Sequence, residues 1–129
     1  LGYARFWAPL IIGKYRNVNA QSKEHAKYWT THYPTVAIIT MAALVKKVVG
    51  LDYSQKFSPA LFILSEQDEV VDAKKSLQIA RQWGGKSSTH LVHCGPYDDP
   101  NSHTIVGDIK SPTQTKQLIK TSLAWIKSL

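Results

Sequence analysis

The stretch 58–72, SPALFILSEQDEVVD, most limits what this chain can fold into. Its continuous apolar run, Ala60–Leu64, is typical of a strand buried on both faces of a parallel sheet. Pro59 is tolerated at the start of that strand, where no ladder hydrogen bond is lost. An acidic loop follows, and Asp72 is well placed to cap a helix that runs through Trp83. The segment therefore predicts a strand, a loop and a helix in direct succession.

The remainder of the C-terminal part repeats this alternation. Gly84 and Gly85 end the predicted helix, and His90–Cys94 is the next predicted strand. A long loop at 95–110, rich in Gly, Pro, Asp and Asn, leads to a last amphipathic helix over 113–129, for which Ser111 is the expected cap and Pro112 the first position. Strand, helix, strand and helix in this order predict an α/β fold with a parallel sheet.

The first part of the chain, 1–57, has a different character. Gln21–His32 predicts a polar helix with Ser22 as its N-cap. A second helix is predicted from Pro34, because apolar residues recur at helical spacing until Gly50 provides a C-terminal stop. No alternating pattern indicates a strand. We therefore expect two domains, a helical segment over 1–57 and an α/β segment over 58–129.

Composition narrows the function classes. The formal net charge is +7, but the lysines are dispersed and no basic-aromatic motif is present, so we expect no nucleic-acid partner. The single cysteine, Cys94, excludes an intrachain disulfide, and no Cys/His cluster has metal-ligand spacing.

No apolar run reaches the ~18 residues of a membrane span. Because the chain starts at Leu1 rather than Met, we expect it to belong to a longer polypeptide, which leaves localisation open with the cytoplasm slightly favoured.

Two titratable side chains follow the two predicted strands. Asp68 lies just beyond Leu64, and His103 lies in the loop after the second strand. Adjacent parallel strands bring such loops to one sheet edge, where ligands bind in open α/β sheets. A carboxylate that accepts the Nδ1–H of an imidazole fixes its tautomer and leaves the other nitrogen free to take a proton from a nucleophile. The alternative is a turn-forming surface carboxylate and an ordinary loop histidine.

Other side chains compete for both roles. Asp72 is better explained as a helix cap, and a strand histidine is more often a hydrogen-bonded structural residue. The histidines of the helical segment are expected at the surface. The competing carboxylates are Glu66, Glu69, Asp72, Asp98 and Asp99, and the competing histidines are His25, His32, His90 and His93.

Three motifs in 58–129 together resemble the C-terminal half of an α/β-hydrolase. Leu61–Leu64 followed by Ser65-Glu-Gln-Asp68 and two valines is similar to the acid strand of that family. Asn101-Ser-His103-Thr-Ile-Val-Gly107 is similar to its histidine loop, and the terminal helix over 113–129 is similar to the helix that closes the fold. The resemblance implies a partial α/β-hydrolase fold, in which 1–57 is a helical cap or lid and 58–129 holds the last two parallel strands with their helices.

The resemblance also implies an activity and its residues. Asp68 would be the acid and His103 the general base of a serine hydrolase that cleaves carboxylic esters, of the esterase, lipase or lysophospholipase type. The chain lacks the Gly-x-Ser-x-Gly elbow, so the serine and the N-terminal half would lie upstream, and this chain alone is expected to be inactive. No metal or organic cofactor is needed, and the expected partner is an ester or lipid substrate. Alternatives are another activity of the family, such as a peptidase or dehalogenase, or a non-catalytic binding or dimerisation module, with homo-oligomerisation possible.

Overall fold

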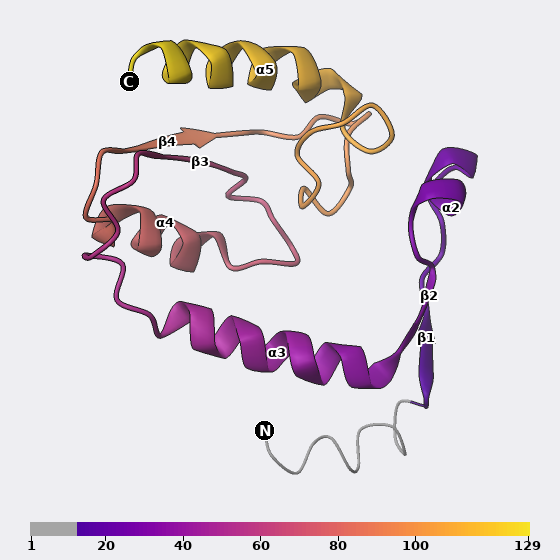
Figure 1. The fold of residues 1–129 in the computed structure, drawn as a ribbon. Coiled ribbons are helices and arrows are strands. Elements are labelled where there is room, and N and C mark those ends of the chain that lie inside the picture. The colour runs from indigo at the N-terminus through magenta and orange to yellow at the C-terminus, as the bar shows by residue number, and fades with distance from the viewer. Residues whose placement is uncertain (1–12) are drawn as a thin grey trace. The chain divides into compact units, whose positions relative to one another are not determined.

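The computed structural model describes residues 13–129, which have a mixed α/β fold with one antiparallel and one parallel pair of strands (Figure 1). The chain divides into two compact units, Leu1–Leu51 and Asp52–Leu129. The sequence placed the division after residue 57. Residues 1–12 of the predicted helical segment lie outside the described residues. We call Leu1–Leu51 the N-terminal unit and Asp52–Leu129 the C-terminal unit.

The N-terminal unit contains a short antiparallel pair of strands that the sequence analysis did not predict. Strand β1 (Tyr15–Asn17) pairs with β2 (His32–Pro34). The Tyr15 ring stacks on the His32 ring at a centroid distance of 4.6 Å, and His32 Nδ1 lies 2.7 Å from Asn17 Oδ1. The expectation that this part is only helical was therefore wrong. Strands of three residues are too short to show an alternating pattern of apolar and polar residues.

Helix α2 (Lys23–Tyr28) begins as predicted and ends early. Its N-cap is Ser22, whose hydroxyl accepts a hydrogen bond from the His25 amide at 3.0 Å. The prediction that this helix continues to His32 was wrong, because the chain after Tyr28 extends and pairs with the β1 segment. The Val18 amide donates to the Thr31 carbonyl at 2.8 Å, which leads directly into β2.

Helix α3 (Thr35–Val49) confirms the helix predicted from the apolar spacing. Pro34 is its N-cap rather than its first residue, and Gly50 is its C-cap as expected. The buried Thr35 hydroxyl donates to the Gly13 carbonyl at 2.6 Å, which anchors the start of the helix. Apolar side chains farther along, including Met41 and Leu44, are exposed.

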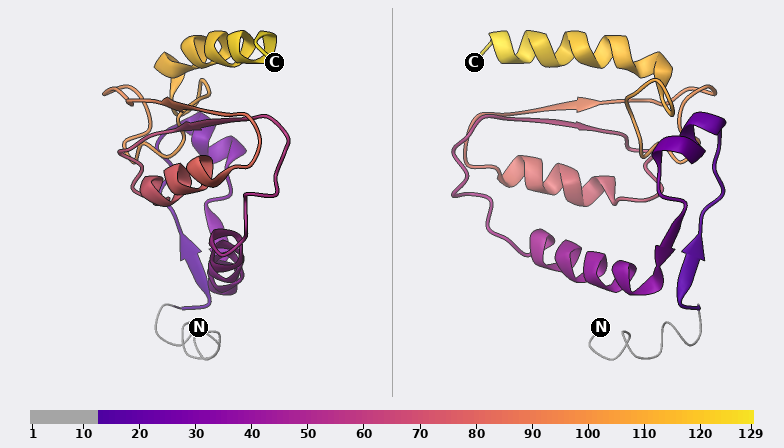
Figure 2. Two further views of the ribbon diagram at one scale, coloured as in Figure 1. Left: turned by 90° about the vertical axis from the view of Figure 1, so that its left-hand side faces the viewer. Right: turned by 45° about the vertical axis from the view of Figure 1, so that its right-hand side comes forward.

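The C-terminal unit contains the predicted strand, helix, strand and helix. Strand β3 (Ala60–Leu64) pairs in parallel with β4 (Ser87–Leu91), and α4 (Ala73–Gln82) connects them. Figures 1 and 2 show α4 on one side of this pair of strands and α5 (Pro112–Lys127) on the other. The bounds of β3 and the capping of α4 by Asp72 are both as predicted, but the residues of β3 are half-buried rather than buried on both faces.

Strand β4 begins three residues before its predicted start at His90, and ends at Leu91 rather than Cys94. Its register against β3 explains the difference. The Ala60 amide donates to the Lys86 carbonyl and the Val92 amide donates to the Leu64 carbonyl, both at 2.9 Å. These bonds bracket the ladder at its two ends. The prediction missed the start of the strand because it relied on apolar content, and Ser87 and Ser88 are polar.

The apolar core of the C-terminal unit contains Tyr53, Ala80, Val92 and Leu118. Beside it, the Trp83 ring stacks on Tyr53 at 5.9 Å and meets Phe62 edge-on at 5.5 Å. The Trp83 indole N–H donates to the Ser58 carbonyl at 2.8 Å. This aromatic cluster ties the end of α4 to the segment that leads into β3.

Helix α5 begins at Pro112, the predicted first position, and Ser111 is its N-cap as predicted. The Ser111 hydroxyl makes no capping hydrogen bond, because it accepts from the Asp99 amide and donates to the Thr104 carbonyl. The carboxylate of Asp98 accepts from the Thr113 amide at 3.1 Å and takes over the capping role. Among the apolar residues of this helix, Leu118 is buried, whereas Ile119, Leu123 and Ile126 are exposed.

Candidate functional site

The acid loop, 65–72, follows the C-terminal end of β3 and begins with a tight turn. Ser65 is buried, and its hydroxyl accepts a hydrogen bond from the Gln67 amide at 3.1 Å. Asp68 Oδ1 then accepts from the amides of Val70 and Val71, each at 2.8 Å. Short polar side chains commonly hold turns in this way. Two backbone donors therefore fix the orientation of the Asp68 carboxylate.

The histidine loop, 95–111, follows β4 and meets the acid loop through the main chain. The Glu69 amide donates to the Asn101 carbonyl at 3.0 Å. Ser102 is buried and has a positive φ of 50°, a left-handed conformation that is uncommon for a residue with a side chain. Its amide donates back to the Asp99 carbonyl at 2.8 Å. This turn presents His103 directly beside the acid loop.

The structure brings the two predicted site residues together. His103 Nδ1 lies 3.0 Å from Asp68 Oδ2 and 3.2 Å from Asp68 Oδ1. Because an ionised carboxylate can only accept, Nδ1 carries the proton and Nε2 is the free basic nitrogen. The Asp68 side chain is 14% exposed and that of His103 is 43% exposed. The carboxylate is therefore sheltered while the imidazole remains accessible to a reacting group.

Local interactions keep Asp68 ionised. Partial burial acts to raise its pKa, but the hydrogen bonds from His103 and from the Val71 and Val70 amides outweigh burial. The net result is a pKa below the ordinary aspartate value. A carboxylate that stays ionised at neutral pH is suited to orient an imidazole and to stabilise its protonated form.

Asp98 and Asp99, the competitors within the histidine loop, have structural partners of their own. Asp98 accepts from the Gly95 amide at 2.8 Å and from the first turn of α5. Asp99 forms an ion pair with Lys110 at 3.1 Å and accepts from the Thr104 amide at 2.8 Å. Sequence reasoning missed this network. Its one visible signal was two adjacent aspartates in a loop that has a single lysine near its end.

The remaining competitors have other surroundings. Glu66 and Glu69 are exposed, and Asp72 caps α4 by accepting from the Lys74 amide at 3.0 Å. His25 is buried, contrary to its expected surface position, because its Nδ1 accepts from the Gln21 amide at 3.0 Å and its ring meets Trp29 edge-on. The other histidines are His32 in β2, His90 in β4 and His93 in the segment after β4.

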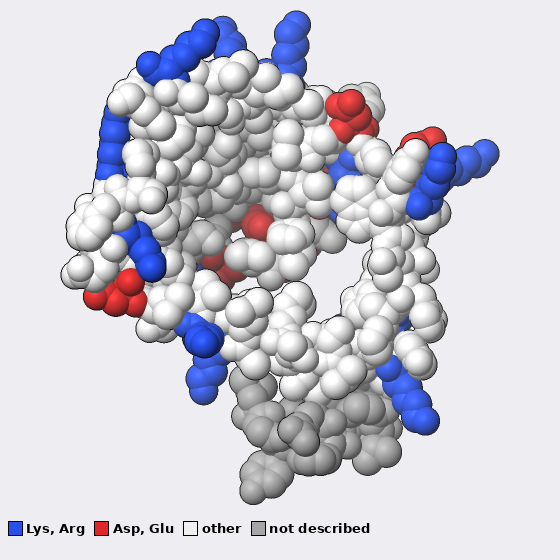
Figure 3. Space-filling view, in the orientation of Figure 1, with Lys and Arg blue, Asp and Glu red and all other residues white. Residues whose placement is uncertain are grey.

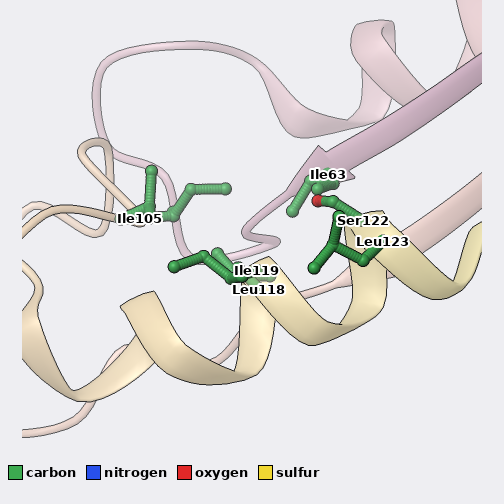
Figure 4. A pocket seen from close by; sticks show the side chains of 7 residues that line it. Ile63, Ile105, Leu118, Ile119, Ser122 and Leu123 are labelled. Atoms are coloured by element: carbon green, nitrogen blue, oxygen red, sulfur yellow. The ribbon is translucent and has the colours of Figure 1, made fainter. Parts of the chain in front are cut away.

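An apolar groove of about 520 Å³ lies between β3 and α5 (Figure 4). The histidine loop continues into it, since Ile105 and Val106 come shortly after His103 in the chain. Asp68 and His103 do not line it. Its lining residues are Ile63, Ile105, Val106, Leu118, Ile119, Ser122 and Leu123.

Neither a metal-binding cluster nor a membrane-spanning helix occurs in residues 13–129. No group of three or more His, Cys, Asp or Glu side chains in this range could hold a metal ion. None of the helices in it combines the length and the apolar character needed to cross a membrane. On the face shown in Figure 3, Lys and Arg side chains are spaced apart in each unit, with uncharged surface between them.

Comparison with known proteins yields no relative. No family model, no curated protein and no solved structure matches this chain.

Proposed function

We propose that Asp68 and His103 are the acid and the general base of a Ser-His-Asp triad in a serine hydrolase that cleaves carboxylic esters. In this proposal 58–129 supplies the last two parallel strands of an α/β-hydrolase core, and 1–57 supplies a cap or lid. The serine and the donors that stabilise the oxyanion come from outside this chain. The substrate is an ester or lipid of the esterase, lipase or lysophospholipase class.

The observation that carries the proposal is the contact between His103 Nδ1 and the Asp68 carboxylate at 3.0 Å. It joins two loops that follow adjacent parallel strands, which is where active sites of open α/β sheets lie. The same contact would not be expected of a turn-forming surface carboxylate, which needs no imidazole partner.

The chemistry follows from the free Nε2 of His103. This nitrogen would take the proton from the serine hydroxyl as the oxygen attacks the ester carbonyl. The imidazolium formed is stabilised by the ionised Asp68 and then gives its proton to the departing alcohol. Water would attack the acyl-enzyme in the second half of the reaction, again with His103 as the base. Asp68 stays ionised throughout and keeps the proton on Nδ1.

The test is fluorophosphonate labelling of the full-length polypeptide that contains these residues, compared among single variants. We expect stoichiometric labelling of the wild type, and a labelling rate lower by roughly 10³–10⁴-fold in both His103→Ala and Asp68→Asn. Asparagine at 68 can still accept the Val70 and Val71 amides, so this variant removes the charge while keeping the turn. Labelling would be followed by intact-protein mass spectrometry.

Two matched controls accompany these variants. Asp72→Asn replaces the neighbouring carboxylate with an equally good N-cap residue, and His93→Ala removes an exposed histidine near β4. Both controls should be labelled at the wild-type rate. A well-folded wild type that takes up no probe would contradict the proposal and favour a non-catalytic module or a different nucleophile. Undiminished labelling of either Asp68→Asn or His103→Ala would show that the acid or the base has been assigned wrongly.

A further inference from the structure

Asp99 holds the histidine loop from inside. The residue is 2% exposed, and its carboxylate lies within the turn that carries His103. Oδ2 accepts from the Thr104 amide at 2.8 Å, and Oδ1 accepts from the Asn101 amide at 3.4 Å. The carboxylate therefore binds the main chain on both sides of the Ser102–His103 pair.

Two further groups hold Asp99 itself in place. Lys110 Nζ lies 3.1 Å from Asp99 Oδ1, and the side chains of this pair are 11% and 1% exposed respectively. The Ser111 hydroxyl accepts from the Asp99 amide at 3.1 Å and donates to the Thr104 carbonyl. A buried charge is tolerated when it is paired and hydrogen-bonded, and both conditions are met here. The start of α5 is thereby tied to the residue that follows His103.

Asp98 provides an internal comparison because it is adjacent and almost as well buried, at 7% exposed. Its carboxylate accepts from Gly95, Thr113 and Gln114, and none of these partners lies in 99–104. The two aspartates therefore have separate tasks. Asp98 caps α5, whereas Asp99 shapes the turn around His103.

From this geometry we infer that Asp99, with Lys110 as its counterion, is a positioning residue that holds the His103 imidazole against Asp68. The inference rests on the proposed function for its catalytic meaning. It adds a second carboxylate to the site. Asp99 acts through the Thr104 and Asn101 amides, and it touches neither the imidazole nor a substrate.

The test uses the ¹⁵N-labelled 129-residue chain and follows the His103 Nδ1–H resonance by NMR. Exchange of that proton with solvent reports how often the Asp68–His103 contact opens. We expect Asp99→Asn to speed this exchange by about tenfold or more, and Asp98→Asn to change it by less than about twofold. Lys110→Arg, which keeps the counterion, should stay close to the wild-type rate.

A second variant covers the case in which Asp99→Asn does not fold. Ser111→Ala removes one hydroxyl from the same network, and we expect it to speed exchange in the same direction by a smaller factor. Equal acceleration in Asp99→Asn and Asp98→Asn would overturn the inference, because it would show a general loss of stability. Unchanged exchange in Asp99→Asn, or in Ser111→Ala where Asp99→Asn is unfolded, would overturn it as well.

Labelling of the full-length polypeptide separates this inference from the proposed function. If the wild type reacts with the fluorophosphonate, Asp99→Asn should react more slowly and Asp98→Asn at close to the wild-type rate. If the wild type does not react, the proposed hydrolase activity fails, and the NMR comparison still decides whether Asp99 positions His103.

Discussion

The two units bury different kinds of side chain. In the C-terminal unit, apolar residues such as Leu118 and Val92 are buried together with Asp98, Asp99 and Ser111. In the described part of the N-terminal unit, the buried residues are the polar His25 and Thr35, and no large apolar side chain is buried. The C-terminal unit thus combines an apolar core with a buried polar network, whereas the N-terminal unit is held by caps and short strand pairing.

This difference shows where a precise side-chain arrangement can be maintained. A site needs residues whose positions are over-determined by their neighbours, and a buried network with several hydrogen bonds to each carboxylate meets that need. Helix α3 presents an apolar surface instead, with Met41 and Leu44 exposed. The candidate site accordingly lies in the unit that has both a core and a network.

Acidification should produce the largest difference in behaviour between the two units. Burial acts to raise the pKa of Asp68, Asp98 and Asp99, but hydrogen bonds outweigh it and leave each pKa lowered. The stability that these groups contribute is complete above the ordinary aspartate pKa of about 3.9, and is lost as pH falls through the lowered native values. We expect the C-terminal unit to lose structure below about pH 4, where protonation of Asp99 also leaves Lys110 unpaired.

The measurement is the pH dependence of amide resonances, assigned separately to 13–51 and 52–129. The first 51 residues hold a single carboxylate, Glu24, which is exposed. Resonances of the N-terminal unit should therefore change less between pH 6 and pH 3 (roughly the range of aspartate titration) than those of the C-terminal unit. If the amide resonances of both units were lost at the same pH, the two units would not respond to acid independently.

Leucine truncation gives the next largest contrast. Leu118 is 4% exposed in the C-terminal unit, and Leu44 is 60% exposed on α3. Leu118→Ala should lower the free energy of unfolding by about 2–5 kcal/mol, because it removes buried methyl groups and leaves a cavity. Leu44→Ala should change it by less than about 0.5 kcal/mol. Urea denaturation of the two variants measures both, and equal losses would show that Leu44 is buried in solution.

Glycine replacement should give the smallest difference in stability between the two units, and the two replacements should have opposite signs. A Cβ on Gly84 would stand 1.8 Å from the Ser54 carbonyl oxygen, whereas a Cβ on Gly50 would meet nothing closer than 3.5 Å. Gly84→Ala should therefore destabilise the protein by at least about 1–3 kcal/mol. Gly50→Ala, at a negative φ, should stabilise it by about 0.4–1 kcal/mol. Thermal unfolding of the pair checks both, and a neutral Gly84→Ala would mean that the chain near Ser54 can move away.

Patterns of apolar residues predicted the longer elements well. The bounds of β3, the cap of α4 and the extent of α3 followed from an apolar run, one aspartate and helical spacing. The strands β1 and β2 escaped notice because three residues carry too little pattern to distinguish a strand from a loop. The shift of β4 came from pairing with β3, a long-range effect that no local window contains.

The candidate site was predicted in part. Chain order and sheet topology were enough to place Asp68 beside His103, since both follow parallel strands. The sequence does not show which of Asp98 and Asp99 caps α5 and which holds the turn around His103, because adjacent aspartates in a polar loop look alike. Their partners, Thr113 for one and Lys110 for the other, are set by how the loop folds back on α5.

The hydrogen bond from the Glu69 amide to the Asn101 carbonyl has a consequence for divergence of the sequence. It joins two peptide groups, so side-chain replacement at either residue leaves the donor and acceptor in place. Among the natural amino acids, only proline at position 69 would delete the donor. Descendants of this chain can therefore exchange the side chains at positions 69 and 101 while the two loops remain joined to each other. The spacing of the Asp68–His103 pair is then inherited through the backbone.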